Sequence, residues 1–260
     1  MPLPLQVVDA FTAAPFRGNA AGVVLLDAPR ADEWMQAVAA EMKHSETAFL
    51  LPIDDGFDLR WFTPTTEVDL CGHATLASAH ALWDWGVLDE SAPVRFSTRS
   101  GPLTCVLLGD VVEMDFPAMS VTLATAPDGL FGALGIAPTH VHRGEFGALV
   151  EAADAATVRT IAPDMARLAD IDVPAVIVTA RDDTYDVVSR VFAPRIGIPE
   201  DPVTGAAHCV LATYWAPVFG NELHAFQASA RGGVVLTRLE GDRVHLGGAA
   251  ITVLRGELDA

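Results

Sequence analysis

Residues 60–64 read Arg60-Trp61-Phe62-Thr63-Pro64, and a related stretch, Arg190-Val191-Phe192-Ala193-Pro194, stands 130 positions later. A segment of small residues follows each stretch. It reads Cys71-Gly72-His73-Ala74 in the first case and Thr204-Gly205-Ala206-Ala207 in the second. Features that recur in the same order at nearly one offset indicate an internal repeat. The chain is therefore predicted to consist of two similar halves.

Two more matches place the division between the halves. Ser97–Gly101 returns as Ser229–Gly233, and Gly109-Asp110 returns as Gly241-Asp242, each at an offset of 132. The segment 119–129 contains proline and glycine and has no clear hydrophobic period. We therefore predict an N-terminal lobe over residues 1–118 and a C-terminal lobe over residues 119–260, with the linker near 119–129. A return of the last strand to the N-terminal lobe is left open.

Within each half, the hydrophobic pattern predicts several strands and one long helix. Alternating apolar residues indicate strands at 5–11, 57–62, 111–116, 187–192 and 234–239. Helical spacing predicts helices over 32–42, with Asp32 as the N-cap, over 72–85, and from 205 to about 215. This composition of elements predicts an α+β fold, in which a strongly bent sheet surrounds a central helix in each of two lobes.

Composition excludes several classes of protein. Apolar residues make up 51% of the 260 positions, so the chain is not disordered. Its 16 basic and 34 acidic residues give a net charge of −18, which disfavours nucleic acid and anionic membrane surfaces as partners. The first residues do not resemble a secretory signal, and the three cysteines are widely spaced, so we expect a reduced, cytoplasmic protein.

The two small-residue segments lie at predicted helix N-termini. The first turn of a helix has unpaired N–H groups and a positive dipole end, which favour a carboxylate or an enolate oxygen. Gly72 and Gly205 would let a ligand approach the backbone closely. The alternative at this point is that both glycines serve only to pack the helices tightly.

Several side chains near these segments could carry chemistry, and each also has an ordinary structural explanation. His73 could be a core histidine, Asp201 a turn residue, Glu46 an exposed carboxylate and Cys71 a small buried apolar side chain. His140 and His142 share one face of a short strand, but no third ligand is evident, so a metal site is disfavoured there.

The whole set of motifs resembles the PhzF family, named for the phenazine-biosynthesis isomerase. The resemblance extends nearly from end to end. The segments that carry it are Val8–Thr12, Phe16–Asn19, Ser45–Phe49, Arg60–Pro64, Glu67–Thr75, Glu200–His208 and Gln227–Gly233. It implies a diaminopimelate-epimerase-like fold: two pseudo-symmetric lobes, each a curled, mostly antiparallel sheet around a central helix, with the site between them.

The resemblance also implies an activity: a phenazine biosynthesis-like, cofactor-independent isomerase, usually a homodimer, that moves a proton between carbons of a small cyclic amino or hydroxy acid. No cofactor and no metal are expected. By motif position, Glu46 would be the acid/base, and His73 and Asp201 would assist it. The substrate and its carboxylate would be bound by the following residues: Gly72, Gly205, Ala206, Ser45 and Asn19.

This sequence departs from the family pattern at one position and leaves two other functions open. Many members carry serine where Ala206 stands, so one hydroxyl that would contact the substrate is missing. Cys71 and Thr204 occupy repeat-equivalent positions, which keeps a Cys71-dependent epimerase or dehydratase as an alternative. A non-enzymatic binding protein on the same fold is the other alternative.

Overall fold

The computed structural model describes residues 2–137 and 140–259. The chain divides into two compact units. Unit 1 takes the chain up to Asp115 and again from Gly247 onward, and unit 2 takes the continuous segment Phe116–Leu246. The chain thus leaves unit 1 between residues 115 and 116, whereas the sequence-based boundary stands at 118/119, and it re-enters unit 1 near its end.

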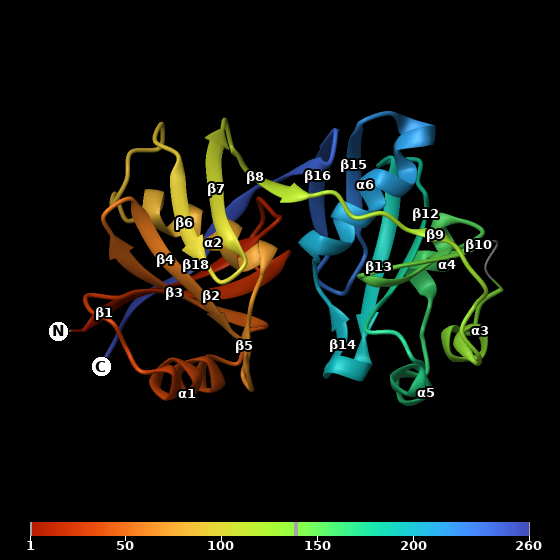
Figure 1. Cartoon of the computed structure of the whole chain (residues 1–260), viewed down its shortest axis with the longest axis horizontal. Helices are drawn as coiled ribbons and strands as arrows, with labels where there is room; N and C mark the ends of the chain where they lie inside the picture. Colours follow the sequence, from red (N-terminus) through yellow and green to blue (C-terminus); the bar gives the residue numbers. More distant parts are fainter. Residues whose placement is uncertain (1, 138–139, 260) are drawn as a thin grey trace. The chain divides into compact units, whose positions relative to one another are not determined.

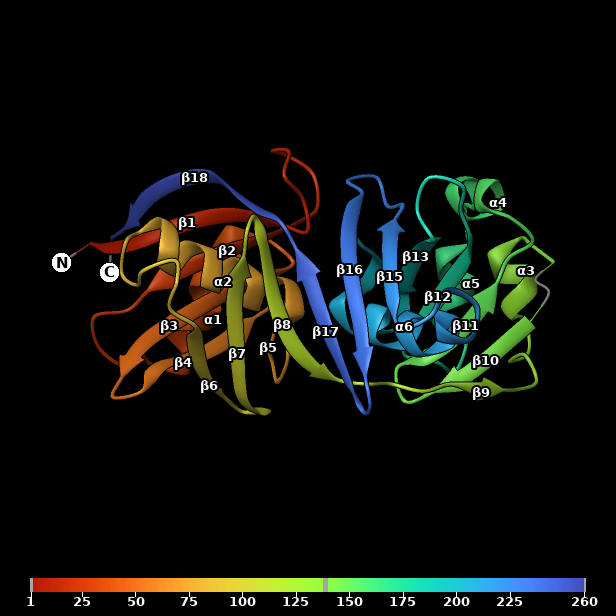
Figure 2. The ribbon, with the colours of Figure 1, turned by 90° about the horizontal axis from the view of Figure 1, so that it is seen from above.

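Unit 1 consists of a curled sheet with one helix inside it (Figure 1). Its elements are β1 (Leu3–Ala10), β2 (Asn19–Leu25), α1 (Asp32–Met42), β3 (Glu46–Ile53), β4 (Gly56–Phe62), β5 (Glu67–Val68), α2 (Gly72–Asp84), β6 (Val94–Thr98), β7 (Gly101–Leu108), β8 (Val111–Pro117) and β18 (Ala250–Leu258). Helix α2 packs against β1, β2, β3 and β18. The last strand, β18, lies antiparallel beside β1 (Figure 2).

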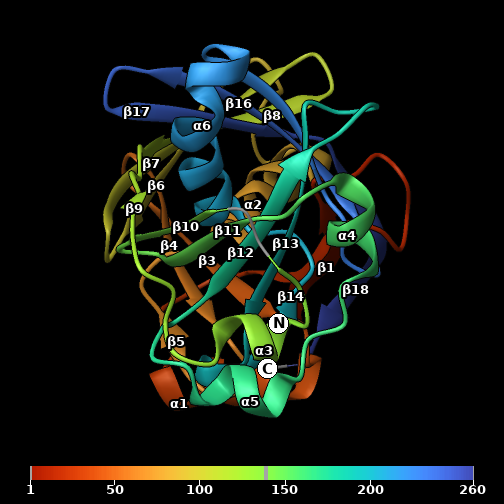
Figure 3. The same cartoon turned by 90° about the vertical axis from the view of Figure 1, so that its right-hand side faces the viewer.

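Unit 2 repeats this plan. Its elements are β9 (Thr122–Leu123), α3 (Leu130–Leu134), β10 (His140–Gly144), β11 (Gly147–Glu151), α4 (Ala155–Thr160), α5 (Met165–Asp170), β12 (Val176–Arg181), β13 (Val187–Ala193), β14 (Ile198–Asp201), α6 (Gly205–Phe219), β15 (Glu222–Gln227), β16 (Gly233–Glu240) and β17 (Arg243–Gly248). A short 3-10 turn, Pro194–Ile196, precedes β14. The short helices α3 and α5 lie side by side at one end of the unit (Figure 3).

The internal repeat is visible in the directions of strand pairing. In unit 1, β1–β2 is antiparallel, β2–β3 parallel, β3–β4 antiparallel, β4–β6 parallel and β6–β7 antiparallel. In unit 2, the pairs β10–β11, β11–β12, β12–β13, β13–β15 and β15–β16 follow the same series of directions. Parallel neighbours need a crossover, usually a helix. Accordingly, α1 and α2 make the crossovers of unit 1, and α4, α5 and α6 make those of unit 2.

In each unit, the first strand of this series pairs with a strand that follows the other repeat in the chain. After β8, the chain forms β9, which pairs with β10 of unit 2. After β17, it forms β18, which pairs with β1 of unit 1 along the whole length of that strand. The two short sequence matches at 109–110 and 241–242 are the turns that precede β8 and β17.

Both long helices are buried because their sequences are apolar or small on every side. Ten residues of α2 are buried, including His73, Thr75 and Ser78. The hydroxyl groups of Thr75 and Ser78 donate hydrogen bonds to backbone carbonyl oxygens one turn earlier in the chain. Helix α6 is similar, with His208 as its buried polar residue. A helix that is apolar all round belongs in a core, so these helices form the centre of their units.

The predicted elements are confirmed in type, with one correction. The predicted strands correspond to β1, β4, β8, β13 and β16, and the predicted helices correspond to α1, α2 and α6, the last of which continues to Phe219. The prediction that Asp32 caps α1 is wrong. The N-cap is Ala31, and Asp32 is the first helical residue, because its carboxylate binds Arg60 at 2.7 Å.

Over residues 2–137 and 140–259, no helix combines the length and the apolar composition needed to cross a membrane.

Candidate active site

Glu46 and Asn19 stand at the starts of two neighbouring parallel strands of unit 1. Glu46 begins β3 and Asn19 begins β2, and Ala21 lies directly opposite Glu46. The turn before β2 needs Gly18, which has a φ of +61°, and a Cβ there would lie 2.0 Å from the Ala10 carbonyl oxygen. This turn brings Asn19 back beside Ala10, at the same end of the sheet as Glu46.

Two polar contacts lead from Ser45 to His73, and the other side of the His73 ring lies against Glu46. The Ser45 hydroxyl donates to Asn19 Oδ1 at 3.2 Å, and Asn19 Nδ2 lies 3.2 Å from His73 Nδ1. On the other side of the ring, His73 Nε2 lies 3.2 Å from Glu46 Oε2. An amide NH₂ group can only donate. His73 Nδ1 is therefore an acceptor, and the ring proton is assigned to Nε2, which lies 3.2 Å from Glu46 Oε2 without meeting hydrogen-bond geometry.

Burial keeps His73 neutral. The residue is 5% exposed, and desolvation, helped by nearby His44, lowers its pKa to about 3. At neutral pH the ring is therefore uncharged beside Glu46 and not a cation. A neutral imidazole with one fixed proton orients the carboxylate without neutralising its charge, which is what a carboxylate base requires.

The start of helix α2 adds a thiol and a set of backbone donors. Cys71 is the N-cap of the helix, and its Sγ lies 3.5 Å from His73 Nδ1. Within the described part of the chain, no side chain caps this first turn. The amides of Gly72 and His73 belong to that turn, where helix N–H groups have no intrahelical acceptor. Together they form an environment suited to an anion.

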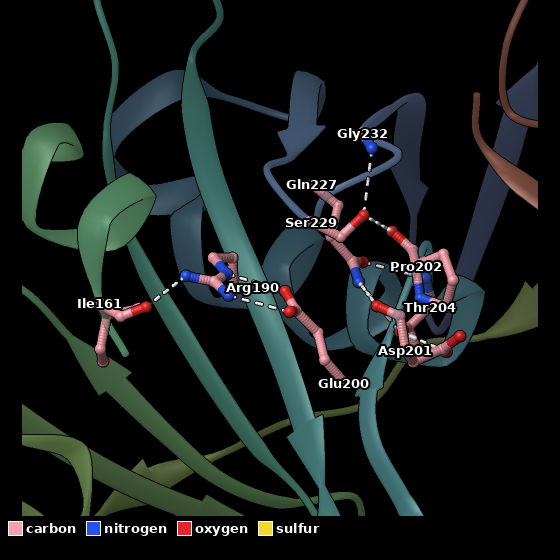
Figure 4. A network of polar contacts seen from close by, with 9 residues as sticks. All are labelled: Ile161, Arg190, Glu200, Asp201, Pro202, Thr204, Gln227, Ser229 and Gly232. Atoms are coloured by element: carbon pink, nitrogen blue, oxygen red, sulfur yellow. Dashed lines mark hydrogen bonds and ion pairs between the residues drawn. The ribbon is translucent and has the colours of Figure 1, made fainter. Parts of the chain in front are cut away.

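In unit 2, the buried side chain of Gln227 binds the backbone just before helix α6 (Figure 4). Thr204 is the N-cap, and its hydroxyl donates to Asp201 Oδ2 at 2.6 Å. Gln227 is fully buried. Its Oε1 accepts from the Thr204 N–H at 2.9 Å, and its Nε2 donates to the Asp201 carbonyl at 2.7 Å. Asp201 is thus fixed at its backbone and at its carboxylate.

The predicted substrate-contacting residues of unit 2, Gly205 and Ala206, are the first two residues of α6. Ser229 supports the loop before them: its hydroxyl donates to the Pro202 carbonyl at 2.8 Å and accepts from the Gly232 N–H (Figure 4). In unit 1, Ser100 does the same for the loop before α2, donating to the Asp69 carbonyl at 2.7 Å.

Each repeat also anchors its loop with an arginine fork. Arg60 makes two hydrogen bonds to Glu67, and Arg190 makes two to Glu200, all between 2.7 and 2.8 Å. Each guanidinium lies over the phenylalanine two residues ahead, at 5.2 Å in unit 1 and 5.0 Å in unit 2. This is the physical meaning of the repeated Arg-x-Phe motif: it fixes the segment that leads to the site helix.

The structure thus collects five of the predicted residues, Asn19, Ser45, Glu46, Gly72 and His73, in unit 1. The other three, Asp201, Gly205 and Ala206, gather in unit 2. Gln227 was not predicted as a functional residue. The sequence pointed to Gln227 only as the first residue of the motif 227–233. Its amide binds a loop 23 positions away in sequence, and such a contact produces no local sequence pattern.

His140 and His142 take part in a different contact. His142 packs edge-on against Tyr214, with ring centroids 4.9 Å apart, and the Tyr214 hydroxyl donates to Glu151. Burial and the Glu151 carboxylate raise the pKa of Tyr214. Among the described residues, the group of potential ligand side chains that lie close together is instead Glu46, Cys71 and His73, whose ligand atoms are all within 4.8 Å of one another.

Comparisons with known proteins agree with the geometry. The family model for phenazine biosynthesis-like proteins, PhzC-PhzF, matches residues 8–256. An uncharacterized isomerase of Halalkalibacterium halodurans is 48% identical over 99% of both chains. The human phenazine biosynthesis-like domain-containing protein is 37% identical over the full length of both.

Solved structures extend the comparison. The structure of a PhzF family protein from Enterococcus faecalis superposes with a TM-score of 0.96 and 37% identity over the full length of both chains. A hydroxyproline epimerase from Agrobacterium vitis shares the fold alone, with a TM-score of 0.67 and 12% identity over 99% of this chain and 92% of that one. The fold is thus the epimerase-like α+β fold, and the chain belongs to the PhzC-PhzF family of phenazine biosynthesis-like proteins, an isomerase family.

Proposed function

We propose that the protein is a cofactor-independent isomerase that moves a proton between two carbons of a small cyclic amino or hydroxy acid, with Glu46 as the acid/base. The observation that carries the proposal is the contact of His73 Nε2 with Glu46 Oε2 at 3.2 Å, in a buried ring whose Nδ1 lies 3.2 Å from the Asn19 amide nitrogen. One carboxylate that is oriented but not neutralised can remove a proton and return it elsewhere.

The proposed reaction has two steps. Glu46 Oε takes a proton from a substrate carbon, and the electron pair of the broken C–H bond moves into the conjugated system of the substrate. Negative charge then develops on a substrate oxygen, where backbone N–H groups such as those of Gly72 and His73 stabilise it. The Glu46 carboxylic acid next gives the same proton to a second carbon, which restores the carboxylate and completes the isomerisation.

The remaining assignments follow from the family resemblance. Asp201 binds an amino or hydroxyl group of the substrate, and the amides of Gly205 and Ala206 contact its carboxylate. With alanine at position 206, we expect a substrate that does not need the hydroxyl that serine supplies in many relatives.

Asp201→Asn keeps the shape of the side chain, so it should raise KM for an amino-bearing substrate more than it lowers kcat. We also expect a cytoplasmic homodimer, which analytical ultracentrifugation would test.

The experiment is deuterium uptake followed by NMR. The protein in D₂O is mixed with a dihydro-hydroxyanthranilate and a panel of cyclic amino and hydroxy acids. Glu46→Gln should lower the exchange rate by ~10²–10⁴-fold, because general acid–base catalysis contributes about that much. The matched control is Glu41→Gln, an exposed glutamate at the end of α1, which should exchange like the wild type. Full activity of Glu46→Gln would contradict the proposal.

A second function is favoured by one contact. Cys71 Sγ lies 3.5 Å from His73 Nδ1, a distance at which the imidazole could accept the thiol proton. This contact supports a Cys71-dependent epimerase or dehydratase. In that case Cys71→Ala would abolish exchange and Glu46→Gln would leave part of it. Absence of exchange on every member of the panel would instead favour a binding protein that keeps the fold.

A further inference from the structure

Three side chains of different chemistry meet at the starts of β3 and α2. The ligand atoms of Glu46, Cys71 and His73 all lie within 4.8 Å of one another. In the described part of the chain, they are the group of three potential metal ligands that lie this close together. They come from two elements that are 25 positions apart in sequence, so the fold brings them together and sequence spacing alone does not reveal them. The proton-transfer mechanism uses the carboxylate and the imidazole but gives the thiol no role.

The donor set is one that zinc prefers. Thiolate, imidazole and carboxylate are the three usual zinc ligands in proteins, and three protein ligands leave a fourth position open. With Zn–S of ~2.3 Å and Zn–N of ~2.0–2.1 Å, two tetrahedral ligands are separated by about 3.5 Å. Cys71 Sγ and His73 Nδ1 already stand at 3.5 Å. The soft thiolate favours Zn²⁺ over the hard cations Mg²⁺ and Ca²⁺.

We propose that Glu46, Cys71 and His73 form a binding site for a thiophilic divalent cation such as Zn²⁺, and that the bound ion inhibits the enzyme. On binding, the Cys71 thiol loses its proton to solvent and forms a bond to the ion. His73 contributes the Nδ1 lone pair, which now accepts from Asn19, and the Asn19 amide turns aside. The Glu46 carboxylate, which lies beside Nε2 in this structure, turns toward the Nδ1 side of the ring to supply the third ligand. Binding does not depend on the proposed function. Inhibition does, because it follows from occupation of Glu46 and His73.

The chain provides its own control. Cys209 is also buried, at 2% exposure in α6, and burial raises the pKa of its thiol to about 12. It does not belong to the ligand group that Cys71 joins. Cys71→Ser and Cys209→Ser therefore make the same chemical change with opposite expectations for metal binding.

The test is a titration of the EDTA-treated full-length protein with CoCl₂, followed by absorption, and then with ZnCl₂. The wild type should bind one Co²⁺ per chain with a thiolate-to-cobalt charge-transfer band, and Zn²⁺ should displace it because Zn²⁺ binds such sites more tightly. Cys209→Ser should behave like the wild type. Cys71→Ser should lose the band and bind Zn²⁺ on the order of 100-fold more weakly, because a direct ligand matters at least as much as an outer-shell partner.

Three results would overturn the site: no charge-transfer band in the wild type, a band that persists in Cys71→Ser, or a Zn²⁺ affinity that this substitution does not change. If Cys71→Ser fails to fold by circular dichroism, Glu46→Gln provides the second variant. It keeps the thiol, and it should weaken Zn²⁺ binding by about 10-fold or more. Unchanged affinity there contradicts the proposed third ligand.

Inhibition is measured separately. Zn²⁺ should suppress deuterium exchange by the wild type in proportion to its binding, and EDTA should restore it. If no substrate exchanges, the proposed function fails while the cobalt titration still decides the metal site. If exchange is normal with the ion bound, the site stands as a binding site and the inhibition is contradicted.

Discussion

In the proposed mechanism, the position of a single proton on His73 affects how Glu46 acts as the acid/base. The Asn19 amide donates to Nδ1, so the ring proton lies on Nε2, the nitrogen that is 3.2 Å from Glu46 Oε2. Asn19 itself is oriented by the Ser45 hydroxyl, which occupies its oxygen. Three side chains thus fix one tautomer, in the way that outer hydrogen-bond partners fix ligating or catalytic histidines elsewhere.

Replacing Asn19 with aspartate tests this directly. An ionised Asp carboxylate has the same shape but cannot donate, so it would draw the ring proton to Nδ1 and leave Nε2 without a proton for Glu46. We expect kcat to fall by ~10–100-fold, the usual cost of losing such a partner, and the pH–rate profile to gain a histidine ionisation. The exposed Asn221→Asp serves as control. An unchanged kcat and pH profile would show that the tautomer does not matter.

The two buried histidines predict how stability depends on pH. Burial lowers the pKa of His73 to about 3 and that of His208 to about 4, whereas an unfolded histidine titrates near 6.5. The unfolded chain therefore binds more protons below pH 6.5. Above pH 6.5, these two histidines should not make the free energy of unfolding depend on pH. From pH 6.5 down to about 4, it should fall by about 1.4 kcal/mol per pH unit for each histidine.

Urea unfolding at several pH values between 7.5 and 4.5 measures this slope. His208→Gln keeps a side chain that can donate to the Thr204 carbonyl, which His208 Nδ1 contacts at 2.8 Å, and it should reduce the slope by one proton. The exposed His224→Gln should leave the slope unchanged. Equal slopes in all three proteins would mean that His208 is not buried as a neutral group.

At the scale of the elements, the arginine forks hold the strand ends that lead to α2 and α6. Arg60 and Glu67 have only 20% and 12% of their side chains exposed, so their two hydrogen bonds are partly shielded from water. Arg99 also contacts Glu67, at 2.7 Å, but half of its side chain is exposed. Shielded, two-point pairs contribute more to stability than exposed ones.

This contrast gives a paired prediction. Arg60→Met leaves the Glu67 carboxylate partly buried without its fork, so the free energy of unfolding should fall by about 1–3 kcal/mol. Arg99→Met should cost less than about 1 kcal/mol, as exposed ion pairs do. Denaturant unfolding of both variants checks the difference, and equal losses would show that the fork adds nothing beyond an exposed ion pair.

The sequence predicts the long elements well because their signals are local. Continuous small and apolar residues mark α2 and α6, and alternation marks the longer strands. The repeat can be recognised because both halves keep Arg-x-Phe and a glycine at the helix start. Short elements such as β9, β14 and α3 have too few residues for a period. The contacts that fix the site, Asn19 with His73 and Gln227 with Thr204, join positions 54 and 23 apart, so no local pattern contains them.

At the scale of the whole molecule, unit 1 depends on two segments of the chain that unit 2 separates. Strand β18 pairs with β1 from Leu3 to Ala10, and Arg255 in β18 makes charge-assisted hydrogen bonds to Asp84 at the end of α2. Unit 2 is one continuous segment. Loss of the C-terminal strand should therefore damage one unit selectively.

Truncation after Gly248 tests this dependence. Removal of β18 uncovers one side of β1 and the buried face of α2, so residues up to 115 should become sensitive to protease while residues 140–246 stay protected. Limited proteolysis with mass spectrometry would map the cuts. Uniform protection of both segments, or uniform loss, would show that the units do not differ in their dependence on β18.

The division of unit 1 into two segments affects the order in which the two units can fold during translation. Domains are usually completed from the N-terminus during synthesis, at ~5–20 residues per second. Here the nascent chain begins unit 1 first but cannot complete it at once, because β18, the partner of β1, is translated after unit 2. Unit 2 has all its residues once position 246 has emerged. Glu46 and His73 are thus translated before unit 2, whereas the strand that completes their own unit is translated after it.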